Sequence, residues 1–282
     1  MSKLTIITIN RNNAAGLEKT MQSVLSQTCQ DVEYVVVDGA SMDGSADVIR
    51  RFAESFGKRM KWVSEPDTGI YNAMNKGIRM ATGEFLQFLN SGDYLAADDV
   101  TERMLAELER QGNPSMLYGN QIKCFPDGRK MLDKGFQGRP VTMLDMYLGS
   151  MNHNATYILR DLFEKHGLYD EGFKIVSDWK WFLQVIVLGG NQPKYTDINT
   201  IMFDMTGISS TGQEINWRER EAVLAALLPE AVLEDYSGYS LEMNLFRQMK
   251  QCPGTKRIVY YLERLLTKCK NRPYKRKNRF RG

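Results

Sequence analysis

Apolar positions in the first ninety residues fall into two alternating patterns. Continuous apolar runs predict strands at Leu4–Ile9, Glu33–Asp38, Met60–Ser64 and Phe85–Leu89. Between these runs apolar residues recur every three or four positions, which predicts helices; these positions are Leu17, Thr20, Met21, Val24 and Leu25, then Val48, Ile49, Phe52, Ala53 and Phe56, then Ile70, Ala73, Met74, Ile78 and Ala81. Strands that alternate with helices predict right-handed crossovers and a mainly parallel sheet with both faces covered.

The second half of the chain has a less regular pattern. Short apolar runs predict strands at Ser115–Gly119, Ile122–Phe125 and Ala155–Leu159, and the spacing over Trp179–Leu188 predicts a helix. We therefore predict one α/β domain, in which a nucleotide-binding half is packed against a mixed half.

Composition is that of an ordinary globular protein with a sizeable core, since 43% of the 282 residues are hydrophobic and 25% are charged. The four cysteines lie far apart without a CxxC pair, so neither a zinc site nor a disulfide framework is expected, and a reducing cytosol is the simplest location. The apolar run at the N-terminus is too short for a signal peptide or a membrane span.

Positive charge is concentrated at the C-terminus. Residues 256–282 contain eleven Lys or Arg and one Glu, a net charge of +10, which leaves −7 for residues 1–255 of a chain with +3 overall. One helical face of this segment is apolar, through Ile258, Tyr261, Leu262, Leu265, Leu266 and Cys269. A basic amphipathic helix favours contact with an anionic membrane surface, although a solvated arm or nonspecific nucleic-acid binding fits the same pattern. We expect peripheral membrane contact and no specific nucleic-acid partner.

Phosphate-binding glycine motifs are missing from the sequence. No GxGxxG follows the first strand and no GxxxxGK[ST] occurs, so a bound phosphate would need another partner. A divalent cation held by carboxylate oxygen serves that purpose, and Asp93 directly follows the strand and turn Glu84–Gly92. The carboxyl end of a buried strand is where open α/β sheets bind ligands. Asp93 is therefore the candidate ligand of Mn²⁺ or Mg²⁺.

Four segments resemble the family 2 glycosyltransferases of the GT-A fold, of the bacterial surface-polysaccharide type. They are Thr8–Asn12, Val37–Ser45, Glu65–Gly77 (EPDTGIYNAMNKG) and Ala81–Glu84 leading to Asn90–Asp93, in the family's order and at the expected strand ends. The resemblance covers roughly residues 3–205. It implies a GT-A domain over 1–212, with a nucleotide-binding half of about 1–95 and an acceptor half of about 96–212, followed by a helical, basic region over 213–282.

The resemblance also implies which residues bind the nucleotide sugar. The family holds the base and ribose at positions that correspond to Thr8, Asn10 and Asp38, and Asp67 would lie near the base or phosphates. Its metal motif ends in a carboxylate that corresponds to Asp93, preceded by three residues on the donor side, Asn90, Ser91 and Gly92. Carboxylates are common where Asn90 and Gly92 stand, so this motif carries less charge than usual.

A catalytic base is expected in the second half. Ile175–Phe182 (IVSDWKWF) resembles the family's acidic dipeptide before an aromatic helix, with Ser177 where Glu is usual. Asp178 would then take the proton of the acceptor hydroxyl during inverting displacement of a nucleoside diphosphate. His153 corresponds to a position that faces the acceptor, and Gly207–Ser210 to a loop over the donor.

The resemblance implies an inverting, metal-dependent transfer of a sugar, with UDP as the expected nucleotide, to a glycan or lipid-linked acceptor at the inner face of the cytoplasmic membrane. Purely structural interpretations stay open, since Asp is also a favourable residue in turns and at helix caps, and this applies to Asp93 and Asp178. A catalytically inactive nucleotide-sugar-binding protein is one alternative. A sugar nucleotidyltransferase is another, but it would need a glycine-rich loop where Thr8–Asn13 has no glycine.

Overall fold

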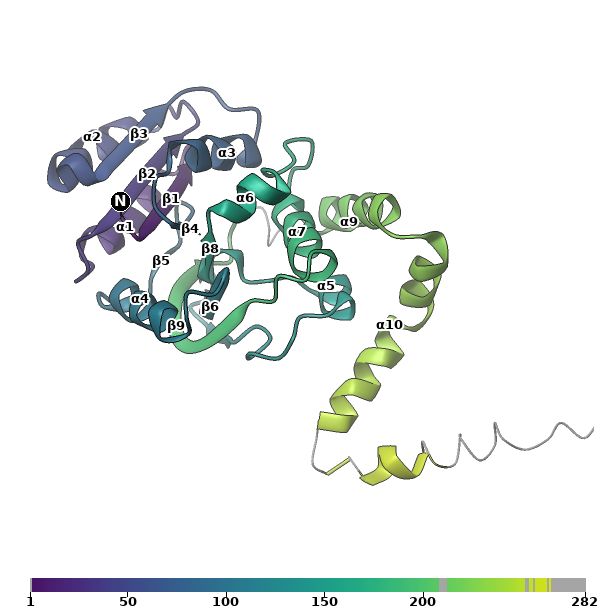
Figure 1. Cartoon of the computed structure of the whole chain (residues 1–282). Coiled ribbons are helices and arrows are strands. Elements are labelled where there is room, and N and C mark those ends of the chain that lie inside the picture. The colour runs from purple at the N-terminus through teal and green to yellow at the C-terminus, as the bar shows by residue number, and fades with distance from the viewer. Residues whose placement is uncertain (1, 208–211, 252–253, 256, 263, 265–282) are drawn as a thin grey trace, which may run out of the picture. The chain divides into compact units, whose positions relative to one another are not determined.

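The computed structural model describes residues 2–207, 212–251, 254–255, 257–262 and 264 (Figure 1). The chain divides into two compact units, Met1–Leu227 and Leu228–Gly282. Helix α9 (Gln213–Leu227), which the sequence analysis assigned to the C-terminal region, groups with the first unit, and α10 (Glu230–Gln251) belongs to the second. Within these described ranges, no helix is long and apolar enough to cross a membrane.

One sheet of nine strands organises the described part of the first unit, in the order β3-β2-β1-β4-β8-β6-β9-β5, with β7 paired to β6. The strands are β1 (Leu4–Asn10), β2 (Val32–Asp38), β3 (Met60–Ser64), β4 (Phe85–Phe88), β5 (Tyr94–Leu95), β6 (Met116–Cys124), β7 (Lys130–Asp133), β8 (Thr156–Leu159) and β9 (Lys194–Asp204). The four strands predicted in the first half are confirmed and mutually parallel. In the second half β8 runs antiparallel to both β4 and β6, so the complete sheet is mixed.

Three crossover helices cover the parallel half of the sheet. They are α1 (Ala14–Leu25), α2 (Ser45–Phe56) and α3 (Ile70–Met80), as the apolar spacing predicts. Right-handed crossovers that step from β1 to β2 to β3 put α1 and α2 on one face, and the return step to β4 puts α3 on the other. Gly77 lets α3 lie directly on β1, because a Cβ atom there would collide with the side chain of Ile7.

The second half departs from the sequence prediction in two places. Ser115–Gly119 and Ile122–Phe125 were expected as separate strands, but β6 is continuous and absorbs the polar Asn120 at irregularities in its register with β9. The helix expected over Trp179–Leu188 is α7 (Ser177–Phe182) followed by a π-helical segment, η3 (Leu183–Leu188). The remaining helical elements are α4 (Val100–Arg110), α5 (Met143–Leu148), α6 (Asp161–His166) and the short 3-10 turns η1 (Gly57–Arg59) and η2 (His153–Ala155).

The strand order reverses direction between β1 and β4. From β1 the chain steps outward to β2 and β3, then crosses back to β4 on the other side of β1. Such a switch point opens a crevice at the carboxyl ends of the two strands. After β4 the chain continues beside β1, where the amide of Ser91 donates to the carbonyl of Ile9 at 3.1 Å. The turn that leads to Asp93 therefore lies at the mouth of this crevice.

Candidate active site

A cleft of about 910 Å³ opens at this switch point. It is lined from one side by the loops after β1 and β4 and from the other by η2, α7, the end of β9 and α9. The sequence-predicted residues that line it are Asn10, Asp67, Asn90, Ser91, Asp93, His153 and Asp178. The other three, Thr8, Asp38 and Gly92, are buried. The fold thus brings side chains more than 160 positions apart into one cleft.

Asn10 lines the floor of the cleft at the end of β1, with Asp38 buried beside it and Thr8 buried further along the strand. The Thr8 hydroxyl donates to the carbonyl of Leu89 at 2.7 Å, and Asn10 Nδ2 donates to Asp38 Oδ1 at 2.7 Å. Burial alone would raise the pKa of Asp38, but hydrogen bonds from Ser41, Ser64 and Asn10 hold it below the usual value. Asp38 therefore stays ionised and shapes the loop after β2. Asn10 Oδ1, buried at the cleft, has no hydrogen-bond partner among the described residues.

Asp67 and Arg11 face each other above this floor. Arg11 Nη1 lies 3.3 Å from Asp67 Oδ1, which also accepts the amide of Gly69 at 3.1 Å. The Asp67 carboxylate lies against Gly39, where a side chain would collide with it. Arg11 is mostly exposed and lines the cleft, so it offers a positive charge that the sequence analysis did not single out.

Asp93 is a buried carboxylate that accepts hydrogen bonds but, among the residues described, forms no ion pair with a basic side chain. Its Oδ1 accepts the backbone amide of Asp204 at 2.9 Å, and its Oδ2 accepts Asn154 Nδ2 at 3.0 Å. Burial is the main reason that the pKa of Asp93 rises to about 7, and the nearby charge of Asp204 adds to the rise. Gly92 has φ +105°, a left-handed conformation that favours glycine at this turn. Asp93 and Asp204 thus place two carboxylates near each other in the cleft.

Asp178 begins the wall of the cleft that α7 forms, in the first turn of that helix, and is half-buried. The Tyr71 hydroxyl, on α3, donates to Asp178 Oδ1 at 2.7 Å and also contacts the carbonyl of Ile175. Burial and the charge of Asp178 raise the pKa of Tyr71 well above its usual value, so the phenol keeps the proton that it donates. Tyr71 therefore fixes one oxygen of Asp178 and leaves the other available.

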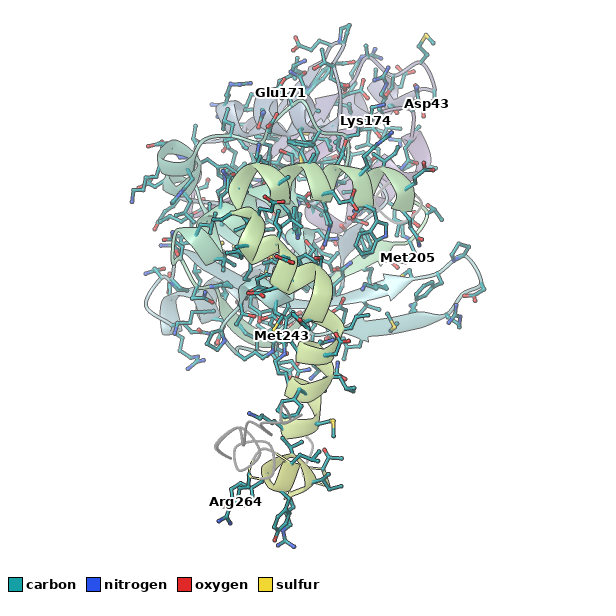
Figure 2. All side chains as sticks on the ribbon, turned by 90° about the vertical axis from the view of Figure 1, so that its right-hand side faces the viewer. Asp43, Glu171, Lys174, Met205, Met243 and Arg264 are labelled. Carbon is teal, nitrogen blue, oxygen red and sulfur yellow. The ribbon has the colours of Figure 1, made fainter. Side chains whose placement is uncertain are left out.

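Helix α9 supports the same wall from outside. Glu219 accepts the backbone amides of Lys174 and Ile175 at 2.8 and 3.0 Å, which ties down the segment that leads into α7. Figure 2 shows α9 between the labelled Lys174 and Met205. Arg220, one residue further, lines the cleft and stacks over the ring of Trp179 with 4.5 Å to the ring centroid.

His153 lies deeper, within a cluster of aromatic rings. Its ring stacks on Phe88 with 4.7 Å between centroids, and its Nε2 lies 2.8 Å from the Tyr169 hydroxyl. Burial lowers the pKa of His153, against the opposite influence of the Asp178 charge, so the ring is neutral at pH 7. The structure places it at the cleft as a neutral, hydrogen-bonded group.

Sequence reasoning missed five residues of this site, Arg11, Tyr71, Asp204, Glu219 and Arg220. Tyr71 stands inside the EPDTGIYNAMNKG segment, where only its place on α3 reveals that it faces Asp178. Asp204 and Arg220 line the cleft from β9 and α9, and Glu219 supports its wall, but no local pattern in the sequence marks them.

The family model for glycosyl transferase family 2 matches residues 5–167 of the chain, more than half of its length. The chain belongs to glycosyl transferase family 2. The resemblance in its four sequence segments is confirmed.

Relatives of this family 2 glycosyltransferase include a PGL/p-HBAD biosynthesis glycosyltransferase of Mycobacterium bovis, 33% identical over 62% of the chain. That match spans 66% of the relative, just under two thirds of its length. An uncharacterized glycosyltransferase of Mycobacterium tuberculosis is 31% identical over 73% of the chain and 77% of its own length.

Solved structures confirm the GT-A-like α/β fold. TarS of S. aureus (residues 1–349), crystallised with UDP, has a TM-score of 0.62 at 19% identity, over 88% of this chain and 78% of that one. The mannosyltransferase PcManGT of Pyrobaculum calidifontis, in complex with GDP-Man and Mn²⁺, has a TM-score of 0.56 at 18% identity, over 78% of this chain and 61% of its own. The ligands named here are those of the two neighbours.

Proposed function

We propose that this glycosyltransferase moves a sugar from a nucleoside-diphosphate sugar, with UDP-sugars as the first candidates, to a hydroxyl of a glycan or lipid-linked acceptor in surface-polysaccharide assembly. The observation that carries the proposal is a single cleft that contains both the buried carboxylate Asp93 and the hydrogen-bonded carboxylate Asp178. The UDP complex of TarS and the biosynthetic name of the mycobacterial relative support the donor and the pathway class.

The nucleoside would lie over the floor made by Asn10 and Asp38. Asn10 Oδ1 is a buried acceptor without a partner among the described residues, so a base N–H or a ribose hydroxyl would satisfy it. Thr8 acts from beneath, because its hydroxyl already holds the chain after β4. Asp67 and Arg11 would border the base or the phosphates, and Asn90, Ser91 and Gly92 would border the sugar diphosphate.

The residues around Asp93 fit a divalent cation that is shared with the substrate. A buried carboxylate whose pKa has risen to about 7 is a group that a bound cation would stabilise in its ionised form. The described residues contain no group of three or more His, Cys, Asp or Glu side chains suited to a metal, so diphosphate oxygens and water would complete the shell around Asp93 and Asp204. When bound, Mn²⁺ or Mg²⁺ would offset the charge of the departing nucleoside diphosphate.

Asp178 would act as the general base. Tyr71 holds one carboxylate oxygen, and the other can accept the proton of an acceptor hydroxyl in the cleft. As that proton moves to Asp178, the acceptor oxygen forms its bond to the anomeric carbon and the bond to the diphosphate oxygen breaks. Displacement from the opposite face in one step inverts the anomeric configuration. His153, neutral and buried, would orient the acceptor side rather than carry a proton.

Calorimetric titration tests the donor and the metal together. The purified chain is titrated with UDP, GDP, dTDP and CDP, with and without Mn²⁺, and the titration is repeated on Asp93→Ala. We expect one nucleotide to bind more tightly with the metal, and we expect Asp93→Ala to lose that gain. Binding of none of the four nucleotides would contradict the proposal, and metal-independent binding would remove the metal role from Asp93.

Asp178→Asn tests the base. This change keeps the size and the hydrogen bond from Tyr71 but removes the basic oxygen, so transfer should fall by about a hundredfold or more while nucleotide affinity stays the same. Product release from the identified nucleotide sugar is measured at saturating donor. Unchanged turnover would show that Asp178 is not the base.

The basic tail would bring the enzyme to an anionic membrane surface at the cytoplasmic face. Most of residues 256–282 lie outside the described residues, so the proposal rests on their net charge of +10 and apolar spacing. In a flotation assay we expect the full chain to move with anionic liposomes, and a chain that ends at Gly254 to remain in the liposome-free fraction. Equal behaviour of both chains would contradict membrane contact through this segment.

A further inference from the structure

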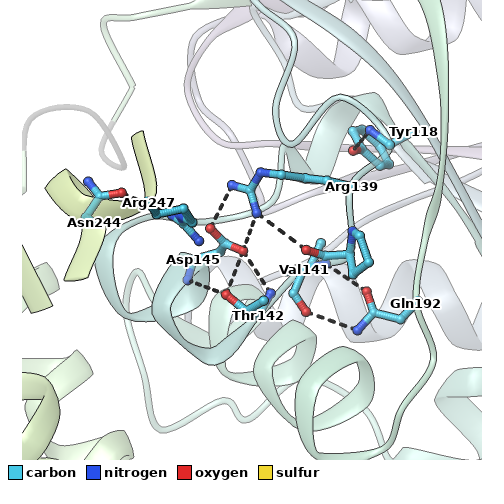
Figure 3. Close-up of polar contacts among 10 residues, drawn as sticks. Tyr118, Arg139, Val141, Thr142, Asp145, Gln192, Asn244 and Arg247 are labelled. Atoms are coloured by element: carbon cyan, nitrogen blue, oxygen red, sulfur yellow. Dashed lines mark hydrogen bonds and ion pairs between the residues drawn. The ribbon is translucent and has the colours of Figure 1, made fainter. Parts of the chain in front are cut away.

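Arg220 differs from Arg139, another half-buried arginine of the second half of the chain. Arg139 forms a two-pronged ion pair with Asp145, with Nη1 and Nη2 at 2.6 and 2.7 Å from the two carboxylate oxygens (Figure 3). The pairing with Asp145 raises the pKa of Arg139, as expected for a compensated charge. This pair shows how the fold neutralises a guanidinium that it does not use at the cleft.

Among the residues that the structure describes, Arg220 forms no ion pair. Its Nη1 donates to the carbonyl of Gly149 at 3.0 Å, its face covers the ring of Trp179, and its Nε has no partner within the described part of the chain. Burial lowers its pKa to about 10, with the charge of Asp178 acting in the opposite direction, so it remains positive at pH 7. A partly desolvated, rigidly held guanidinium that lines the cleft can bind an oxyanion there.

The position of Arg220 in the cleft indicates which substrate it contacts, the acceptor or the donor diphosphate. Its contacts, Gly149 and Trp179, belong to the wall of Asp178, where Lys174 also lines the cleft and is exposed. Two positive side chains and one carboxylate therefore face the acceptor side. Asp93 and Asp204, the residues proposed to face the donor, are carboxylates, which repel a diphosphate unless a cation intervenes.

We propose that Arg220 binds an acidic group of the acceptor, a phosphate or a carboxylate, and thereby holds the acceptor hydroxyl beside Asp178. This assignment rests on the proposed function and specifies its acceptor as an anionic molecule. The planar guanidinium matches both oxyanions, because it donates two parallel hydrogen bonds. Trp179 fixes the plane of the guanidinium and Gly149 fixes its rotation, so the site is formed before the acceptor arrives.

The test separates the acceptor from the donor diphosphate. The full chain is first saturated with UDP and Mg²⁺, or with whichever nucleotide the titration above identifies, which blocks the donor site. Inorganic phosphate and sodium acetate are then titrated calorimetrically into the wild type, Arg220→Gln and Arg220→Lys. Arg218→Gln is the matched control, because it removes the same charge from an exposed position on the same helix.

We expect the wild type to bind at least one of the two anions, and Arg220→Gln to weaken that binding about tenfold or more. Arg220→Lys keeps the charge and should retain part of the affinity, and Arg218→Gln should match the wild type. UDP affinity should change less than twofold in Arg220→Gln, which also shows that this variant is folded.

Three results would overturn the assignment. They are anion binding that Arg220→Gln leaves intact, absence of anion binding in the wild type, and a tenfold loss of nucleotide affinity in Arg220→Gln, which would put Arg220 on the donor diphosphate. Failure of the proposed function gives a different result, in which no nucleotide binds to any variant.

Discussion

Asp178 illustrates how a single residue of this cleft depends on both halves of the fold. Asp178 belongs to α7, but its Oδ1 accepts a hydrogen bond from the hydroxyl of Tyr71, which lies on α3 in the first half of the chain. A hydrogen bond to an ionised carboxylate is stronger than one between neutral groups. The orientation of the proposed base is therefore set by α3, an element far from α7 in the sequence.

Removing the Tyr71 hydroxyl should lower kcat without a change in donor binding. Tyr71→Phe preserves the packing of the buried ring and frees Asp178 to rotate, so we expect kcat to fall about tenfold. The donor KM should change less than twofold. Both parameters come from initial rates of nucleoside diphosphate release.

Tyr118→Phe is the matched control for this measurement. Tyr118 is equally buried, and its hydroxyl accepts the amide of Gly138 at 3.1 Å, away from the cleft. Loss of a buried hydroxyl alone should leave kcat near the wild-type value. An equal fall of kcat in both variants would mean that the effect is general destabilisation.

Several site residues were predictable because they directly follow strands. Asn10 and Asp93 stand at strand ends in the part of the chain where apolar periodicity is clear, and Asp178 opens a recognisable aromatic helix. Asp204 and Arg220 were not predictable, because their function depends on a contact with residues more than forty positions away. A polar residue in the sequence does not reveal which partner the fold gives it.

Among the elements, the start of β2 is tied to its neighbours by a buried carboxylate. Glu33 accepts the Thr5 hydroxyl on β1 at 2.5 Å, the amide and hydroxyl of Thr82 after α3, and Lys61 on β3 at 2.6 Å. Burial alone would raise its pKa, but these four contacts together lower it to about 2. The Glu33 side chain thus links β1, β2 and β3 near the amino-terminal end of β2, whereas the cleft lies at the carboxyl ends of the strands.

This carboxylate should make stability depend on acid pH. Because the pKa of Glu33 is lower in the folded state than its ordinary 4.5, its contribution is fully present above about pH 4.5 and is lost as the pH falls toward about 2. Urea unfolding at a series of pH values should show Glu33→Gln to be less stable than the wild type at pH 7 by about 1–2 kcal/mol.

The difference between the two proteins should shrink toward pH 2, where the wild-type carboxylate becomes protonated. Glu84→Gln is the control, because Glu84 is half-exposed and pairs with Lys3 at 2.8 Å at the surface. We expect this variant to change stability by less than about 1 kcal/mol. A constant difference between Glu33→Gln and the wild type at all pH values would contradict the role of ionised Glu33.

Element boundaries were predictable where one pattern dominated. In the first half, continuous apolar runs and helical spacing alternate cleanly, and β1, β2, β3 and α3 lie where the pattern predicts. In the second half, the polar pair Asn120 and Gln121 interrupts the apolar run of β6 and suggested two strands. The side chain of Asn120 bonds to Asp197 and Asn199 on β9, and only that pairing explains why the strand continues.

At the scale of the whole molecule, every residue that lines the cleft comes from the first unit, Met1–Leu227. Arg220 and Glu219 bring α9 into this unit, although the sequence resemblance ended near residue 205. The smallest part of the chain with a complete cleft therefore extends to the end of α9, beyond the boundary at 212 that the resemblance implied.

Truncation tests this boundary. A chain that ends at Leu227 should bind the identified nucleotide with an affinity within about twofold of the full chain, because no cleft contact is removed. A chain that ends at Gly212 lacks Glu219 and Arg220 and should have a lower melting temperature, measured by circular dichroism. Equal melting temperatures of the two truncated chains would show that α9 contributes little to the first unit.

The reversal of strand order between β1 and β4 has a consequence for how such enzymes diversify. The crevice exists because of the path of the backbone, whereas the side chains that surround it are held by loops and by α7 and α9. Changes in those segments alter what enters the crevice and leave the crevice itself intact. A lineage that keeps this strand order can therefore acquire new acceptors through changes in α7, α9 and the loops beside them. The residues proposed to bind the nucleotide can stay the same.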